Sequence, residues 1–145
     1  MEDTLRSGLL SVVLPSYNEE ASIPRAADTI TAILIDADIP HELVFVDDGS
    51  RDRTWTVIQE QAGRHPQVRG VRFSRNFGKE AAIFAGLAQA RGDCTLVMDC
   101  DLQHPPEKAV EMYRLWQQGY QVVEGVKTSR GKESPIHTLA AKTFY

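Results

Sequence analysis

The segment that decides the fold is Leu9–Glu19, LLSVVLPSYNE, in which an apolar run is followed directly by polar residues. The apolar part, Leu9–Leu14, carries no charge and predicts a buried strand that is stopped by Pro15. Polar residues that follow a buried strand of a parallel sheet stand where such sheets bind their ligands. The segment therefore predicts a buried strand with a candidate binding loop at its carboxyl end.

The same alternation of short apolar runs and amphipathic stretches continues along the chain. Further strands are predicted at 43–46, 68–73, 95–98 and 121–123, and helices at 23–34, 54–62, 79–90 and 105–118. A loop is predicted for 125–135 and the start of another helix for 138–145. Five alternations of strand and helix predict an α/β domain, a mostly parallel sheet with helices on both faces.

Length and charge limit the classes of function. A chain of 145 residues fits one domain, and 20 acidic against 16 basic residues give a net charge of −4. This balance is not typical of a general nucleic-acid binder. No uncharged run approaches the roughly 20 residues of a membrane-spanning helix, and the acidic N-terminus is not a secretory signal. Two cysteines are too few for a disulfide framework and indicate a reducing, cytosolic compartment.

Polar residues gather where the predicted strands end, and the most informative group is Asp99-Cys100-Asp101 with Gln103 just after it. In an extended chain the two carboxylates point the same way, and like charges so close are costly unless a cation neutralises them. Carboxylate and amide oxygens suit Mg²⁺ or Mn²⁺, whereas the cysteines lack the paired spacing of a zinc site. The alternative is a solvated acidic turn before the helix at 105–118.

Two residues near the ends of the first and second strands allow a ligand role and a structural one. Asp48, in the sequence Asp47-Asp48-Gly49-Ser50, either accepts hydrogen bonds from a nucleobase or ribose or belongs to an ordinary turn. Tyr17 either stacks on a base or packs against its neighbours.

Basic residues suggest an anionic ligand. Lys79 begins a predicted helix, and a cation at a helix N-terminus favours phosphate, although a solvated surface is the alternative. Lys127 follows the last predicted strand and either contacts a diphosphate or lies in a linker. Between Arg64 and Arg91 the only acid is Glu80, which is weak support for a polyanionic ligand or acidic lipid headgroups.

Four motifs occur in order along the chain: SVVLPSYNEE (11–20), VFVDDGSRDRT (44–54), SRNFGKEAAIFAGLAQARGD (74–93) and VMDCDLQHPPE (97–107). Together they resemble the family 2 glycosyltransferases with a GT-A fold. More narrowly, the sequence is similar to the polyprenyl-phosphate hexosyltransferases, a group that includes dolichyl-phosphate mannose synthase and bactoprenol glucosyltransferase. The resemblance extends from about Ser11 to Tyr145.

The resemblance implies roles for individual residues. The catalytic pair would be Asp99 and Asp101, and Gln103 would join them in binding Mg²⁺ or Mn²⁺. Contacts to the nucleotide-sugar are implied for Pro15, Tyr17, Glu19, Val46, Asp48, Asp99, Cys100, Asp101 and Lys127, to which the helix-start argument adds Lys79. Cysteine stands where relatives often carry alanine, a mild departure. Lysine at 127 stands where they often carry arginine, and this swap loses bidentate phosphate recognition.

The function implied by the resemblance is metal-dependent, inverting transfer of a hexose, glucose or mannose, from UDP- or GDP-hexose to a polyprenyl phosphate in envelope glycan synthesis. Residues 1–145 would then form the nucleotide-sugar-binding part, without the acceptor part or membrane helices. The full-length protein would work in the cytoplasm at the inner face of the membrane, with no nucleic-acid partner. The alternatives are a non-catalytic nucleotide-sugar-binding fragment and a D-x-D phosphatase-type hydrolase. A dehydrogenase is disfavoured because no G-x-G-x-x-G follows the first strand.

Overall fold

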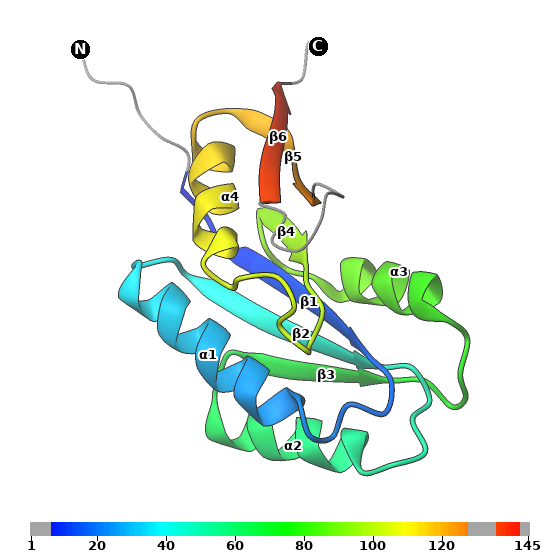
Figure 1. Ribbon diagram of the computed structural model, residues 1–145. Helices are drawn as coiled ribbons and strands as arrows, with labels where there is room; N and C mark the ends of the chain where they lie inside the picture. Colours follow the sequence, from blue (N-terminus) through cyan, green and yellow to red (C-terminus); the bar gives the residue numbers. More distant parts are fainter. Residues whose placement is uncertain (1–6, 128–135, 143–145) are drawn as a thin grey trace, which may run out of the picture.

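A computed structural model of the protein describes residues 7–127 and 136–142, in which strands and helices alternate through most of the chain (Figure 1). In chain order the elements are β1 (Leu10–Ser16), α1 (Ile23–Asp36), β2 (His41–Asp47), α2 (Thr54–Arg64), β3 (Val68–Arg72), α3 (Lys79–Gln89), β4 (Cys94–Val97), α4 (Lys108–Gln117), β5 (Tyr120–Lys127) and β6 (Ile136–Lys142). None of the helices among these residues combines the length and apolar character needed to cross a bilayer.

The first four strands form one parallel sheet in the order β3-β2-β1-β4. The carboxyl ends of β1, β2 and β4 therefore lie along the same edge (Figure 1). Helices cover both faces, so the predicted α/β class with a mostly parallel sheet is confirmed. This topology is what brings residues from distant parts of the sequence to a single site.

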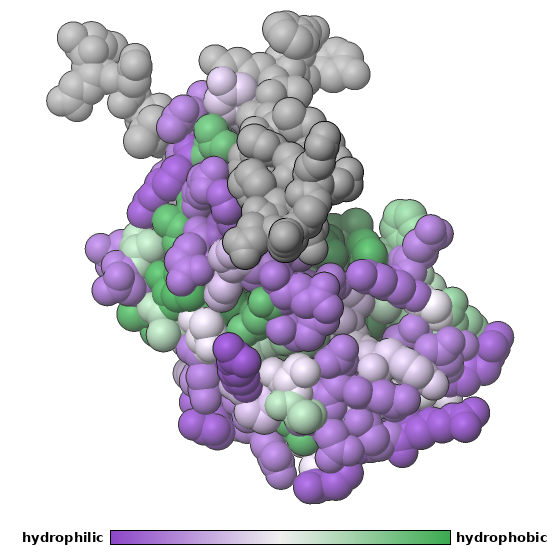
Figure 2. All heavy atoms as spheres, in the orientation of Figure 1, coloured by the Kyte–Doolittle hydropathy of each residue, from purple (hydrophilic) through white to green (hydrophobic). Residues whose placement is uncertain are grey.

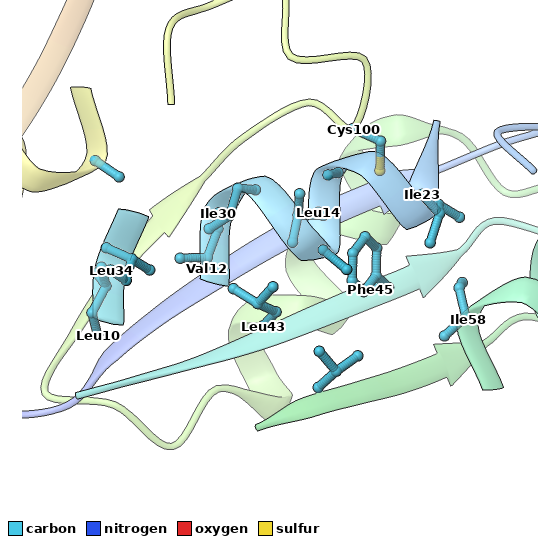
Figure 3. Close-up of a cluster of buried hydrophobic side chains, with 14 of the residues drawn as sticks. Leu10, Val12, Leu14, Ile23, Ile30, Leu34, Leu43, Phe45, Ile58 and Cys100 are labelled. Atoms are coloured by element: carbon cyan, nitrogen blue, oxygen red, sulfur yellow. The ribbon is translucent and has the colours of Figure 1, made fainter. Parts of the chain in front are cut away.

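The sheet is buried on both faces, which explains why its central strands are almost continuously apolar. On one face Leu14 and Phe45 pack against α1 and α2, with α4 completing the cover (Figure 3). On the other face Val13, Val44 and Val46 pack against α3. That helix can lie close to the sheet because Gly86 has no side chain. A Cβ at this position would clash with Val13, since it would stand 2.3 Å from Val13 Cγ1.

Strand β1 does not stop at Pro15 as the sequence predicts, but continues through it to Ser16. The reason is the side to which the proline nitrogen points. The carbonyl of Val13 faces β4, where it accepts a hydrogen bond from the Met98 N–H, and that of Ser16 faces β2, where it accepts one from the Asp48 N–H. Because backbone groups alternate sides along a strand, the nitrogen of Pro15 points toward β4. The pairing of β1 with β4 ends at Val13, so the missing N–H of Pro15 breaks no strand pairing.

The C-terminal part differs more from prediction. Strand β5 extends to Lys127 and pairs with β6 in a separate antiparallel two-stranded sheet, so it does not continue the parallel sheet. The helix predicted for 138–145 is wrong, because residues 136–142 form β6. Pairing of the two backbones outweighs the local helix preference of Ala140 and Ala141. The predicted loop at 125–135 overlaps β5, and its remainder, 128–135, lies outside the described residues.

Two neighbouring residues of α1 provide a test of the buried face. Leu34 is 0% exposed, whereas Ile35 is 61% exposed. We expect Leu34→Ala to lower the free energy of unfolding by about 2–5 kcal/mol through lost burial and the cavity left behind. Ile35→Ala should change it by less than about 0.5 kcal/mol. Urea denaturation followed by circular dichroism measures both, and equal losses would contradict the arrangement of α1.

Candidate functional site

A cleft of about 320 Å³ opens at the carboxyl ends of β1, β2 and β4. Its lining residues are Pro15, Ser16, Tyr17, Glu19, Asp48, Lys79, Ala82, Asp99, Cys100, Asp101 and Gln103. The convergence expected from the sequence is therefore observed, since acids that follow three different strands share one cavity. A second cavity of about 280 Å³ adjoins it, shares Lys79 and Asp99, and has a more apolar wall that includes Ile83, Val97 and Met112.

The acid pair lies in a turn after β4 rather than in extended chain. The carbonyl of Asp99 accepts a hydrogen bond from Leu102 N–H at 3.3 Å, and Leu102 has a left-handed φ of 56°. Asp101 accepts one from Gln103 N–H at 3.2 Å. Although the turn departs from the extended geometry that the sequence suggested, both carboxylates still line the cleft.

Cys100, between the two acids, faces the protein interior and is only 2% exposed. Its sulfur lies 3.0 Å from Ser16 Oγ and donates a longer, 3.8 Å contact to the carbonyl of Pro15. Burial raises the pKa of the Cys100 thiol to about 12, and the neighbouring carboxylates add to this. The residue therefore anchors the acidic turn against β1 as a neutral, packed side chain.

Asp48 follows β2 and holds the segment that leads into α3. Its buried carboxylate accepts hydrogen bonds from the backbone N–H groups of Phe77, at 2.8 Å, and Gly78, at 3.1 Å. It also accepts one from Asn76 Nδ2 at 3.1 Å. The sequence suggested a ligand role or a simple turn for Asp48, and the structure adds a third role, a link between two elements of the site.

Lys79 is the first residue of α3 and reaches across to the acid pair. Its Nζ donates to Asp99 Oδ1 at 2.9 Å, while 62% of its side chain stays exposed. The lysine therefore stands beside the carboxylates that the sequence identified as metal ligands. This contact between α3 and the turn after β4 was not predicted.

The loops after β1 and β2 are joined by hydrogen bonds that sequence reasoning missed. Asn18 N–H donates to Ser50 Oγ at 2.8 Å, and Asn18 Oδ1 accepts from Arg51 N–H at 2.9 Å. Glu19 N–H donates to Thr54 Oγ1 at 2.8 Å. The motifs SYNE and GSRDRT thus fix each other, which accounts for small polar residues that looked like ordinary loop positions.

The opposite end of the sheet holds a second buried carboxylate, that of Glu42 in β2. It accepts hydrogen bonds from Ser11 Oγ at 2.6 Å, from Arg91 N–H at 2.7 Å and from the Arg69 guanidinium at 2.9 Å. Arg69 also donates to the carbonyl of Gln89, at the end of α3. Burial alone would raise the pKa of Glu42, but these hydrogen bonds outweigh it and hold the pKa below its usual value.

Some predicted site residues do not line the cleft. Val46 is fully buried in the core under α3, so its side chain does not line the cleft. Lys127 ends β5, and its side chain lies outside the described part of the chain. Of the basic residues of 64–91, Arg69 pairs with Glu42, and Arg75 stacks on the Phe77 ring at 4.0 Å.

Comparison with known proteins decides the family, since residues 11–141 match the family described as Glycosyl transferase family 2. The chain belongs to this family. Among curated relatives of this family 2 chain, the uncharacterized glycosyltransferase YkcC of Bacillus subtilis is 40% identical over 135 residues, 93% of this chain and 42% of the relative. The undecaprenyl-phosphate 4-deoxy-4-formamido-L-arabinose transferase of Pseudomonas aeruginosa is 43% identical over 123 residues, 84% of this chain and 36% of the relative.

Solved glycosyltransferases share the fold of this family 2 chain. The mannosyltransferase PcManGT from Pyrobaculum calidifontis, in complex with GDP-Man and Mn²⁺, aligns with a TM-score of 0.64 at 25% identity, over 79% of this chain and 33% of that one. The glucosyl-3-phosphoglycerate synthase of M. tuberculosis gives 0.61 at 30% identity, over 82% and 42%. The chain thus spans about two fifths of the length of the relatives it matches.

The metal-ligating side chains of this family 2 chain are compatible with a divalent metal that also binds a phosphate ligand. Residues 7–127 and 136–142 contain no group of three or more His, Cys, Asp or Glu side chains placed to hold a metal alone. Asp99, Asp101 and Gln103 supply two carboxylates and an amide in one cleft. Mg²⁺ sites with one or two carboxylates are commonly completed by substrate phosphates and water. The Lys79 ammonium at Asp99 already marks the position as one that attracts a cation.

The contact between Asp48 and the start of α3 in the family 2 chain can be tested with Asp48→Asn. An amide NH₂ in place of one carboxylate oxygen would face a backbone N–H of Phe77 or Gly78, leaving a buried donor unpaired. We expect the free energy of unfolding to fall by about 1–3 kcal/mol. Thermal and urea unfolding measure the loss, and Asp36→Asn, an exposed acid of α1, is the matched control. An unchanged stability for Asp48→Asn would contradict the proposed link.

The buried thiol of the family 2 chain gives a pH-dependent prediction. Because the folded-state pKa of Cys100 is about 12 against an ordinary 9.0, the native thiol stays protonated at pH 8–9 and should resist iodoacetamide. Above pH 9 the unfolded thiol ionises while the folded one does not, so this group lowers stability as pH rises from about 9 to about 12. Peptide mapping by mass spectrometry should find Cys100 alkylated only after denaturation. Rapid labelling of the native protein at Cys100 would contradict its burial.

Proposed function

We propose that this chain is the donor-binding part of a glycosyltransferase that moves a hexose from a nucleotide-sugar to a polyprenyl phosphate. The observation that carries the proposal is the single cleft in which Asp48, Asp99 and Asp101 meet Tyr17 and Lys79. Membership of family 2 supports the transfer reaction. The relative from Pseudomonas aeruginosa, named for undecaprenyl phosphate, supports the acceptor class. The donor is UDP- or GDP-hexose, and the sugar is glucose or mannose.

The cleft offers side chains for the base and for the diphosphate of such a donor. The Tyr17 ring, 42% exposed at the end of β1, is available to stack on the base. Lys79 is the basic side chain nearest the acids and would contact the diphosphate. Asp99, Asp101 and Gln103 would hold Mg²⁺ or Mn²⁺, which when bound neutralises the charge that develops on the leaving nucleoside diphosphate.

A phosphate acceptor would need less help from the cleft than a sugar hydroxyl would. A hydroxyl nucleophile needs a general base to take its proton. A phosphate monoester is already largely ionised at pH 7, because its second pKa is about 6. The acceptor would then attack the anomeric carbon directly, with inversion. In the full-length protein we propose that this occurs in the cytoplasm at the inner face of the membrane, within envelope glycan synthesis.

A second candidate is a nucleotide-sugar-binding unit that does not turn over by itself. The observation that favours it is the length of the chain, about two fifths of its relatives, which leaves most of their residues without a counterpart here. We expect residues 1–145 to bind donor with little or no transfer. Adding a polyprenyl phosphate and measuring labelled lipid product distinguishes the two candidates.

Calorimetry with UDP-glucose and GDP-mannose, each with and without Mn²⁺, tests the donor site. One of the two should bind the wild type in a manganese-dependent way. Asp101→Ala should weaken that binding at least tenfold, because loss of even an indirect metal contact costs about 10–100-fold in affinity. Asp36→Ala, which removes an exposed acid of α1 away from the cleft, should leave the affinity unchanged. No manganese-dependent binding of either donor would contradict the proposal.

A further inference from the structure

The backbone of Lys79 is held in place while its side chain is free to swing. The residues just before it, Phe77 and Gly78, donate their N–H groups to the buried carboxylate of Asp48. The side chain is 62% exposed and makes its one described contact with Asp99. A lysine placed in this way can change partners without any movement of α3.

The charges around this lysine are one-sided. The described lining of the cleft contains the carboxylates of Glu19, Asp48, Asp99 and Asp101, and Lys79 is its one basic side chain. Like charges in one cavity are costly to maintain, and a cation among them relieves that cost. The Nζ at 2.9 Å from Asp99 Oδ1 provides this neutralisation.

An ammonium and a divalent metal compete for the same carboxylate oxygen. The Lys79 Nζ already lies 2.9 Å from Asp99 Oδ1, and a divalent metal at this oxygen would compete with the ammonium and repel its charge. Metal binding at Asp99 would therefore favour departure of the lysine, and the phosphate oxygens of a donor would offer it a new anionic partner in the same cleft.

We propose that Lys79 is a resident counter-cation of the Asp99–Asp101 pair, which a divalent metal displaces and which the diphosphate of the donor then accepts. This inference rests on the proposed function and adds a consequence to it. The metal alone binds weakly because it competes with Lys79, and it binds more tightly once a nucleoside diphosphate has drawn the lysine away. By linkage, the metal increases the affinity for the nucleoside diphosphate by the same factor.

The experiment measures Mn²⁺ binding from the loss of the free-ion electron paramagnetic resonance signal, first without nucleotide and then with saturating UDP or GDP. Lys79→Met should bind Mn²⁺ alone about two- to fivefold more tightly than the wild type, the range expected for removing an exposed ion pair. The gain in Mn²⁺ affinity that UDP or GDP produces should be smaller in Lys79→Met by a similar factor.

Two control variants make the result specific. Lys79→Arg keeps the charge and should behave like the wild type. Lys108→Met removes a cation that pairs with Glu111 at 3.1 Å and lines only the adjoining cavity, where no described contact joins it to Asp99, so it should leave Mn²⁺ binding unchanged.

Each part of the experiment has its own overturning result. If Lys79→Met binds Mn²⁺ alone no more tightly than the wild type, or if Lys108→Met gives the same gain, the counter-cation inference is overturned. If neither UDP nor GDP alters Mn²⁺ affinity in the wild type, the proposed donor site is overturned instead. A tighter Mn²⁺ affinity in Lys79→Met would in that case still support the competition at Asp99.

Discussion

The buried carboxylate of Asp48 is the interaction on which the rest of the cleft depends. It directly follows β2, and its oxygens accept the N–H groups of Phe77 and Gly78, 29 and 30 residues further along the chain. This contact fixes the backbone just before α3 relative to the end of β2. It thereby helps to place Lys79, the next residue, opposite Asp99.

The remaining walls of the cleft are fixed in a similar way, by polar groups that hold loops instead of facing the solvent. Ser50 and Thr54 hold the loop after β1, and Cys100 packs the acidic turn against Ser16. Among the described residues that line the cleft, exposed side chains belong to Tyr17, Lys79, Asp101 and Gln103. The site thus consists of a few accessible side chains on a framework whose own hydrogen bonds are already satisfied.

The sequence predicted the elements of the parallel sheet well, because a strand buried on both faces is almost continuously apolar, as Val12–Leu14 is. It also placed Asp99 and Asp101 at the end of a strand, where the structure shows both of them lining the cleft. The burial of the Val46 side chain could not be predicted in the same way, because the face to which a side chain points depends on strand register, and register is a property of the folded sheet.

Contacts between distant segments were beyond prediction for a related reason. Arg69 looked like part of a basic surface, but its partner Glu42 is a neighbour only after β2 and β3 pair. The strand β6 was predicted as a helix because residues 138–142 favour a helix locally, and only the partner strand β5 decides otherwise. In each case the missing information was which segments lie side by side.

Strand β2 carries a carboxylate near each end, and both are bonded to the segments that flank α3. Asp48 holds the backbone before the helix, while Glu42 holds Arg91 N–H after it and, through Arg69, the carbonyl of Gln89. A helix fixed at both termini to one strand can neither slide along its axis nor pivot about one end. A ligand in the cleft therefore meets a helix whose position on the sheet is resisted from both termini, which leaves side chains such as Lys79 as the parts that can move most easily.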